Sequence, residues 1–356
     1  MISPNYKIDS FEKLNGKNII VQKDNNYGVL NTNGEEIIPV VNTYIWRVNN
    51  TDFFIANSQG FFNLEANVIE GGKFSLLNEY GDTILPPIYS HISALDGSSK
   101  FLYVSKNDKE YGLFNLEKMC LVLPEMYTTC SVNDFDKNRF TVSQGGTVNE
   151  EGYLANGKYG VVDENNSIII PIEYDLLGSY NEYFIAHKNN LQGIIDLNGK
   201  PIVPIEYDEI DFIDYRLIKL GKGTNPVSEN FVYGAGKYAL YDSEGKSILT
   251  SFAYENFYDM GSHLVYKKDN LNGLMDKSGR EISAPLFSGF EAYSLEGTFI
   301  FSKYQDGVNL FGVLDLNGKE LIPFEYENIA PEKNYFLCIK NGVEIKISRN
   351  NQILKD

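Results

Sequence analysis

Short apolar runs separated by polar turns recur along the whole chain. From Lys158 the sequence reads KYGVVDENNSIIIPIEYD, in which two apolar runs of strand length flank a polar turn. Gly160–Asp163 and Ile168–Ile170 are therefore predicted to be strands. Pro171 is predicted to end the second strand, because proline cannot donate a hydrogen bond to a ladder.

The residues that follow predict further strands. Tyr174–Tyr180 has the pattern of a bend with partial strand character, and Tyr183–His187 that of a strand. Asn189 and Asn190 are predicted to turn the chain into the next copy. Each unit is thus a meander of three or four antiparallel strands. No segment has a sustained apolar period of 3.6 residues, so the predicted fold class is all-β, with helices short or absent.

The same pattern returns at intervals of about 40 residues. LQGIIDLNGKPIVPIEYD begins at Leu191 and LFGVLDLNGKELIPFEYE at Leu310. Weaker copies bring the number to eight, and long and short spacings alternate between them. The chain is therefore expected to be one repeat domain, residues 1–356, with repeats that start near 26, 73, 110, 158, 191, 237, 271 and 310.

A ninth copy looks divided between the two ends of the chain. Residues 341–356 resemble the first half of a unit, and residues 6–24 resemble its second half. A closed ring completes its last unit in this way and leaves no sheet edge open. The divided copy therefore favours propeller-like or ring-like closure over an open β-superhelix of stacked meanders.

The residues that recur at fixed places have structural explanations. A glycine is expected to close the first hairpin with a positive φ, an Asp or Asn to bond turn amides, and a tyrosine to pack between units near a backbone acceptor. The glycines are Gly199, Gly245, Gly279 and Gly318; the turn residues are Asp163, Asp196, Asp242, Asp276, Asp315, Asn31, Asn78 and Asn115; the tyrosines are Tyr89, Tyr127, Tyr174, Tyr207, Tyr254 and Tyr326.

The framework, apolar-apolar-Asp-x-x-Gly-x-x-apolar-apolar-Pro-x-x-Tyr preceded by an aromatic-Gly step, resembles the WG repeat, or KWG repeat, of bacterial proteins. The resemblance covers roughly residues 6–354. Tyr27, Tyr111 and Tyr159 stand among the residues at the tryptophan position, and the one tryptophan, Trp46, lies elsewhere. The resemblance implies a β-rich interaction scaffold without known catalytic residues.

Charge narrows the partners that this scaffold is expected to bind. The chain has 356 residues, with 31 Lys and Arg against 48 Asp and Glu, a net charge of −17. Such a surface repels nucleic-acid phosphates and an anionic membrane, so neither is an expected partner. A basic protein is the partner that opposite potentials favour. The oligomeric state is not indicated by the sequence.

Cysteine usage and the N-terminal segment indicate the compartment. Cys120, Cys130 and Cys338 are an odd number and form no CxxC motif, so a disulfide framework is not expected. The first residues, MISPNYKIDS, lack the apolar core of a signal peptide. The sequence therefore predicts a cytoplasmic protein.

A search for catalytic and metal-binding chemistry gives no positive motif. His91, His187 and His263 are far apart in sequence, and none has a second His or Cys at zinc-ligand spacing. The repeated Asp residues have neither EF-hand nor RTX spacing, which favours turn capping over calcium binding. We therefore expect no enzyme activity, no cofactor and no metal.

Segments that interrupt the repeat are the candidate binding surfaces. They are Ser131–Asn156, Gly221–Gly236 and Asn49–Gly72. The expected partner-binding residues are aromatic anchors and acidic side chains: Trp46, Phe53, Phe54, Phe61, Phe62, Asp134, Asp136, Glu150 and Glu151. The alternative for the phenylalanines is that they form ordinary strand core.

Three classes of function follow, in order of preference. The first is a non-catalytic protein-binding module, with a role like that of a bacterial immunity or antitoxin protein that neutralises a basic partner encoded nearby. The second is a carbohydrate or small-ligand binding protein, in which Tyr174 or Tyr207 would stack on the ligand. The third is an enzyme whose site is assembled from several repeats.

Overall fold

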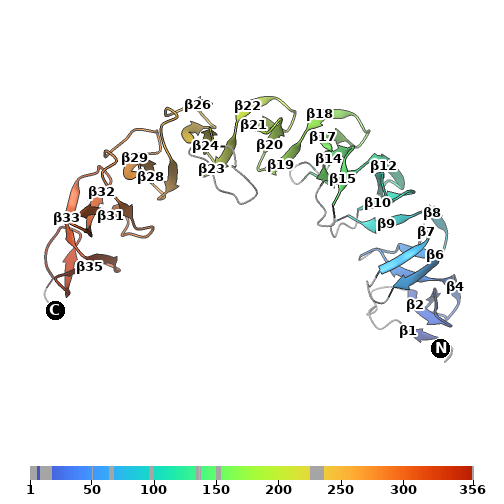
Figure 1. Ribbon diagram of the computed structural model, residues 1–356. Coiled ribbons are helices and arrows are strands. Elements are labelled where there is room, and N and C mark those ends of the chain that lie inside the picture. Colours follow the sequence, from blue (N-terminus) through green and yellow to red (C-terminus); the bar gives the residue numbers. More distant parts are fainter. Residues whose placement is uncertain are drawn as a thin grey trace. The chain divides into compact units, whose positions relative to one another are not determined.

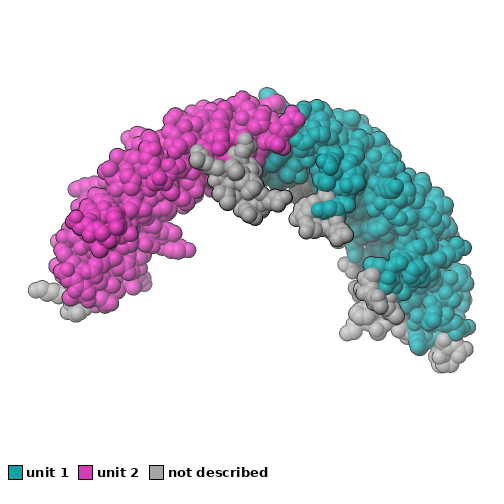
Figure 2. Space-filling model, in the orientation of Figure 1, with its two compact units in different colours: residues 1–188, 196–200 teal, residues 189–195, 201–356 magenta. Residues whose placement is uncertain are grey.

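The structure is a computed structural model that describes residues 6–8, 18–49, 51–63, 68–95, 100–133, 136, 138–149, 154–224 and 236–354. The secondary structure of these residues consists of β-strands, without a helix, which confirms the predicted all-β class. The described part of the chain contains no helix that could span a membrane. Two compact units are distinguished: residues 1–188 with 196–200, and residues 189–195 with 201–356 (Figure 2).

The first unit is a series of antiparallel meanders whose strands pair in chain order (Figure 1). Four meanders have four strands each, and a two-stranded ribbon, β15–β16, is inserted in the fourth. The strands are β1 (Lys7–Ile8), β2 (Asn18–Lys23), β3 (Asn26–Asn31), β4 (Glu36–Asn42); β5 (Tyr44–Arg47), β6 (Phe54–Asn63), β7 (Val68–Leu77), β8 (Thr83–Tyr89); β9 (His91–Ala94), β10 (Phe101–Ser105), β11 (Tyr111–Asn115), β12 (Cys120–Tyr127); β13 (Thr129–Val132), β14 (Arg139–Gln144), β15 (Thr147–Val148), β16 (Leu154–Ala155), β17 (Lys158–Asp163), β18 (Ile168–Tyr174); and the pair β19 (Leu176–Tyr180), β20 (Tyr183–Lys188).

The second unit continues the pattern. It begins with the β21–β22 pair and then has sheets of four, three, four and three strands. The strands are β21 (Leu191–Asp196), β22 (Pro201–Tyr207); β23 (Glu209–Phe212), β24 (Leu217–Lys222), β25 (Lys237–Asp242), β26 (Ser247–Ile248); β27 (Asn256–Asp259), β28 (His263–Lys268), β29 (Leu271–Asp276); β30 (Gly289–Phe290), β31 (Thr298–Gln305), β32 (Val308–Asp315), β33 (Glu320–Tyr326); and β34 (Asn328–Pro331), β35 (Tyr335–Lys340), β36 (Val343–Ser348).

The sequence motif forms the last two strands of each four-stranded sheet, not the first two, and the last strand of each three-stranded sheet. In the fourth meander, Lys158–Asp163 and Ile168–Tyr174 are the third and fourth strands, and Thr129–Val132 and Arg139–Gln144 precede them. The N-terminal strands β1 and β2 accordingly pair within the first sheet, with β3 and β4. This corrects the divided ninth unit, since β36 belongs to a sheet with β34 and β35.

The prolines do not end their strands, contrary to the sequence-based prediction. Strand β18 runs through Pro171 to Tyr174, and β22 runs through Pro204 to Tyr207. The pairing register shifts at these places, because Tyr159 opposes Tyr174 whereas Val161 opposes Ile170. Proline is tolerated here because it lies at a bulge in a strand at the sheet edge.

The cores lie between successive sheets. One cluster joins Leu113 and Leu123 of the third meander to Phe140, Val142 and Val162 of the fourth. Another, in the second unit, joins Leu217 and Leu240 to Leu264 and Met275. Each meander thus buries an apolar face against its neighbour, as in other stacked repeats. The repeat spacing in the sequence is the spacing of these faces.

The hairpin formed by the second and third strands varies in length from one meander to the next. In the first, fifth, seventh and ninth meanders its strands are joined by a two-residue turn, such as Asn189–Asn190 with φ of 55° and 64°. Two residues with positive φ form the tight turn that suits the twist of a hairpin. The eighth meander also has a two-residue turn, Asp306–Gly307, but at the end of longer strands, β31 and β32, and the second meander likewise has longer strands, β6 and β7. The fourth and sixth meanders have longer connections, and the third has one of five residues, 106–110. We call the added segments of the second, fourth, sixth and eighth meanders the lengthened connections, and they produce the long repeat spacings.

Candidate functional site

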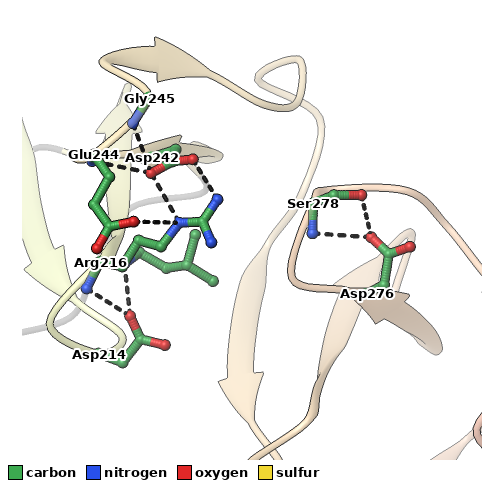
Figure 3. Close-up of polar contacts among 8 residues, drawn as sticks. Asp214, Arg216, Asp242, Glu244, Gly245, Asp276 and Ser278 are labelled. Atoms are coloured by element: carbon green, nitrogen blue, oxygen red, sulfur yellow. Dashed lines mark hydrogen bonds and ion pairs between the residues drawn. The ribbon is translucent and has the colours of Figure 1, made fainter.

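The repeated carboxylates are turn caps. In the turn after β21, Asp196 Oδ1 accepts hydrogen bonds from the backbone N–H groups of Asn198, at 2.8 Å, and Lys200, at 2.9 Å. The backbone N–H of Gly199, whose φ is 80°, donates to the Asp196 carbonyl. Asp276 likewise accepts from the backbone N–H groups of Ser278 and Arg280, and Figure 3 shows its bonds from the backbone and the hydroxyl of Ser278. The predicted capping role is therefore confirmed at these positions.

One glycine of this set differs from its prediction. The turn after β25 has the positive φ at Lys246, 52°, and not at Gly245. Asp242 caps the backbone N–H groups of Glu244 and Gly245, so this turn is one residue longer than the others. The turn at Asn115 is similar, with the positive φ at Met119.

Asp242 is also the centre of an ion pair in the second unit. Arg216 donates to both of its oxygens, with Nε at 3.0 Å and Nη2 at 2.6 Å (Figure 3). These bonds from Arg216 lower the pKa of Asp242 to about 2. On the other side, Asp214 accepts from the backbone of Arg216 and from Lys277 Nζ, at 2.8 Å. The network fixes turns of adjacent sheets, and each of its charges has a partner.

The repeated tyrosines are buried, as predicted for residues that pack between units. The hydroxyl groups of Tyr127 and Tyr254 donate to the side chains of Asn166 and Glu281, where a backbone acceptor was expected. A lysine of the following sheet lies over five of the rings, with its Nζ 5.0–5.8 Å from the ring centroid: Lys106 over Tyr89, Lys188 over Tyr174, Lys222 over Tyr207, Lys268 over Tyr254 and Lys340 over Tyr326.

In three of these places the glutamate before the tyrosine pairs with the same lysine. The Glu173–Lys188, Glu206–Lys222 and Glu325–Lys340 pairs have N–O distances of 2.9, 3.1 and 2.8 Å. The tyrosine rings are therefore covered by their own structure. Tyr174 and Tyr207 cannot serve as the stacking platforms that the carbohydrate hypothesis assigned to them.

The histidines and cysteines are separate from one another. His91, His187 and His263 lie on different strands, and burial lowers the pKa of each imidazole. The cysteines are free thiols, of which Cys130 and Cys338 are buried and Cys120 is exposed. Within the described ranges, no three His, Cys, Asp or Glu side chains are grouped as metal ligands.

The lengthened hairpin of the second meander contains most of the predicted aromatic anchors. Strands β6 and β7 pair over their whole length, but β5 pairs only with Phe54–Asn57 and β8 only with Phe74–Leu77. Ser58–Asn63 and Val68–Lys73 therefore extend beyond the four-stranded sheet. We name these two segments the β6–β7 extension.

Aromatic side chains connect this extension to the sheet. The ring of Phe62 stacks on Tyr44, with centroids 5.9 Å apart and planes at 22°. Tyr44 also contacts Tyr27, at 4.8 Å, and Trp46, at 6.0 Å. Tyr44 and Tyr27 were not among the predicted anchors, because a tyrosine in this sequence is more often a core residue of the repeat.

The predicted anchors do not all reach the surface. Phe54 is fully buried in the core, which corrects its assignment as a binding residue, and Phe53 packs partly buried against the neighbouring core. Trp46 is half-buried, whereas Phe61 and Phe62 are exposed. The difference follows the position along β6: Phe54 lies in the part that pairs with β5, whereas Phe61 and Phe62 lie in the extension, which pairs only with β7.

Of the four predicted acidic binding residues, the structure describes Asp136. Asp136 forms an ion pair with Arg139, at 2.9 Å, and caps the backbone N–H of Asn138. Asp136 is thus held in its own loop and does not stand as a free acidic anchor. Asp134, Glu150 and Glu151 lie outside the described residues.

The bends at the base of the lengthened connections are built alike. Gly71 and Gly72 have φ of 68° and 71° in the second meander, and Gly145 and Gly146 have 69° and 68° in the fourth. The threonine before the first strand fastens each bend: Thr43 Oγ1 donates to the Gly60 carbonyl, at 3.1 Å, and Thr128 Oγ1 to the Gly145 carbonyl, at 2.9 Å. In the sixth meander Asp208 accepts from the backbone of Gly223 and Thr224.

Some of the exposed apolar side chains lie on the lengthened connections, and others lie elsewhere in the described residues, such as Tyr215 and Tyr293. In the eighth meander, β31 and β32 also extend past their neighbours, up to the pair Gln305–Val308. Those on the lengthened connections, with their exposed fractions, are Phe61 58%, Phe62 39% and Val68 48% in the second meander, Val148 45% in the fourth, and Tyr304 67% and Val308 54% in the eighth. The signal in the sequence that could have located the set is the alternation of repeat spacing.

Comparison with known proteins identifies the repeat. A family model described as "WG containing repeat" matches residues 159–190, 193–215 and 311–342. No curated protein matches the chain significantly. The three matched segments lie in the copies whose sequences agree best with the consensus.

Three solved structures are distantly similar to the chain. A structure described as that of the eukaryotic initiation factor is 11% identical, covers 90% of this chain and 88% of its own, and has a TM-score of 0.33. BamB from Moraxella catarrhalis is 10% identical, with 84% and 97% covered and a TM-score of 0.27. The computationally designed Ika8 protein is 11% identical, with 85% and 92% covered and a TM-score of 0.26. These scores are too low to assign the arrangement of the sheets.

Proposed function

Because this chain belongs to the WG repeat family, we propose that it is a non-catalytic protein-binding module whose lengthened connections hold a basic protein partner. The proposal assigns no catalytic residue, no cofactor and no metal to the chain. Neither nucleic acid nor a membrane is proposed as a partner, because the chain's net charge of −17 repels phosphates and anionic lipids.

The observation that supports the proposal best is the β6–β7 extension. It lies beyond the part of the sheet where four strands pair, and it carries three exposed apolar side chains, Phe61, Phe62 and Val68. Exposed apolar side chains in a group cost solvation free energy unless a partner covers them. Aromatic residues are also the commonest anchors of protein interfaces.

Charge supports a basic partner over a neutral one. With 48 acidic against 31 basic side chains, the chain attracts a positively charged protein at long range and repels other acidic proteins. The aromatic anchors then supply the short-range contact. Binding is expected to weaken as salt rises, because salt screens exposed charges beyond about 8 Å at physiological ionic strength.

Within this class, the role that we favour is neutralisation of a toxic partner, as an immunity or antitoxin-like protein of the bacterial cytoplasm does. A toxin that acts on nucleic acid carries basic residues to bind phosphates, and an acidic binder covers them. Such a partner would be encoded next to this chain. Expression of the adjacent gene should then be toxic alone and harmless together with this protein; toxicity that persists on co-expression rejects this role.

The binding proposal is tested by affinity capture with the tagged protein at low and at moderate salt. The expected result is one stoichiometric basic protein, retained better at low salt by the wild type and lost with the F61S/F62S double variant. The matched control is Y293S, which changes an exposed aromatic residue outside these connections. Equal retention by the double variant and the wild type contradicts the assignment of the site.

We also propose that the sheets close into a ring. The first sheet is complete with β1–β4, so closure would join the ends through sheet packing and not through a shared strand. Spin labels at Glu36 and Glu344 in a C120S background test it. Packed sheets lie about 10 Å apart, so closure predicts a short distance between the labels. A long distance supports the open superhelix.

A further inference from the structure

A pocket in the first unit lies between the third meander and the ribbon of the fourth. Its volume is about 640 Å³, within the range typical of small-molecule sites. The third meander supplies His91, Tyr103 and Tyr111. The opposite wall is formed by Thr128, Thr129, Gly146, Thr147 and Val148.

The first wall of the pocket is aromatic. The ring of Tyr111 meets His91 edge to face, with centroids 5.8 Å apart and planes at 80°, and Tyr103 in the same way, at 6.1 Å and 82°. Burial lowers the pKa of His91, so its imidazole is neutral at pH 7, and His91 Nε2 lies 2.8 Å from Ser93 Oγ. The wall is therefore an uncharged surface held by ring contacts.

Two opposite charges stand beside these rings. Asp108 and Lys109 both line the pocket, and the Asp108 carboxylate is close enough to raise the pKa of Tyr111, after the larger effect of burial. Asp108 has a φ of 59°, which its backbone N–H holds through a bond to Ser105 Oγ, at 2.9 Å. The pair leaves the pocket without net charge.

Hydroxyl groups complete the lining on the other wall. Thr128 Oγ1 donates to the Gly145 carbonyl, and Thr129 Oγ1 lies 2.6 Å from Ser143 Oγ. Their oxygens have further lone pairs that can accept hydrogen bonds. Thr147 stands at the exposed side of the same wall.

We propose that this pocket binds a neutral carbohydrate. A pyranose ring has an apolar C–H face, which packs on aromatic rings, and a rim of hydroxyls, which donate to a carboxylate and accept from an ammonium group or a hydroxyl. The pocket offers each of these partners. An anion would meet Asp108 and the negative field of the chain, and a cation would meet Lys109.

The pocket shares one wall, Gly146–Val148, with the lengthened connection of the fourth meander, but the inference does not require the protein partner proposed above. The critical residue, Asp108, belongs to the β10–β11 connection of the third meander and not to a lengthened one. It also moves the carbohydrate hypothesis from Tyr174 and Tyr207 to Tyr103, which the repeat pattern does not single out, and to Tyr111, which stands at the tryptophan position of the repeat. The sugar can be free or attached to a protein, since both present the same ring.

Saturation-transfer NMR of the full chain with maltose, cellobiose, lactose and N,N′-diacetylchitobiose tests the proposal. At least one disaccharide is expected to bind saturably. D108N should weaken that binding about tenfold, since it removes a charge-assisted hydrogen bond. T147V should weaken it less. The control is D306N, at an exposed hairpin position with φ of 47° in the second unit, and it should bind like the wild type.

A loss of sugar binding can be distinguished from a loss of folding. Asn tolerates positive φ as Asp does, so D108N is expected to keep the wild-type urea midpoint. Failure of all four sugars to bind the wild type overturns the proposal, and so does equal binding by D108N and D306N. If a disaccharide binds, competition with a glycoprotein that ends in the same sugar distinguishes a free from an attached ligand.

Discussion

The glycine of the aromatic-Gly step sets how closely the third and fourth strands of a meander approach. At Gly160 a Cβ would lie 2.7 Å from both the Ile170 carbonyl oxygen and Ile172 Cγ1. The requirement is close approach, since φ here is not positive, and it coincides with the bulge that accommodates Pro171. The glycine and the proline of the motif are thus two parts of one feature.

Gly160→Ala is expected to destabilise the protein by about 2 kcal/mol or more, because the carbonyl that it meets belongs to a backbone and cannot turn away. The control is Gly178→Ala in the same unit, where a Cβ would meet nothing within 4 Å. Its effect should stay within ~1 kcal/mol. Urea midpoints of both variants measure the difference, and equal midpoints contradict the close-approach explanation.

The Asp242 ion pair makes stability depend on pH. The folded-state pKa of about 2 lies below the ordinary value of 3.8. The contribution of Asp242 is therefore fully present above about pH 4 and is lost as pH falls through about 2. The stability gap between wild type and D242N should be largest at neutral pH and should close between these values.

Urea unfolding at several pH values measures this gap. Arg216→Met should show the same closing gap, because it removes the partner that donates to both oxygens of Asp242. A gap that stays constant from neutral pH down to about pH 2 would show that the ion pair does not set the pKa of Asp242.

At the scale of elements, the strands that contain the repeat motif could be predicted from the sequence, and the others could not be grouped correctly. The runs Gly160–Asp163 and Ile168–Ile170 have strong signatures and lie in strands β17 and β18 as expected, but β18 continues through Pro171 to Tyr174, which was not expected. The first two strands of each sheet, such as β13 and β14, carry no fixed residues. Their grouping with the following motif was therefore missed, and the unit was placed half a repeat out of frame.

The candidate site was harder to predict than the fold. A run such as Phe53-Phe54 next to Phe61-Phe62 reads the same whether a side chain faces the core or solvent. Only the register of β6 against β5 and β7 decides it, and that register follows from long-range pairing. The pocket beside Tyr111 depends on two meanders and leaves no local pattern.

The β6–β7 extension predicts a contrast between two phenylalanines of one strand. Phe54→Ala should destabilise the protein by about 3–5 kcal/mol, since it empties a fully buried site. Phe61→Ala should change stability by no more than ~0.5 kcal/mol, since the side chain is exposed. Thermal or urea unfolding compares them; a large loss of stability in Phe61→Ala would show that the extension is part of the core.

At the scale of the whole molecule, the second, fourth, sixth and eighth meanders carry lengthened connections, and the other meanders do not. Buried faces, tyrosines under lysines and capped turns account for the stability of the stack. The exposed apolar groups on the connections have no such role. In the first unit, both the second and the fourth meander carry such groups, which favours a partner large enough to contact more than one of them.

Hydrogen–deuterium exchange of the full chain, with and without its captured basic partner, tests this account most directly. The account predicts that the partner slows exchange at 58–63 and 68–73 and in at least one of the other lengthened connections, at 145–148 or 304–309. Exchange at the short turns, such as 189–190, should not change. Protection confined to the short turns, or to the outer strands β4, β8 and β12, would contradict the central claim.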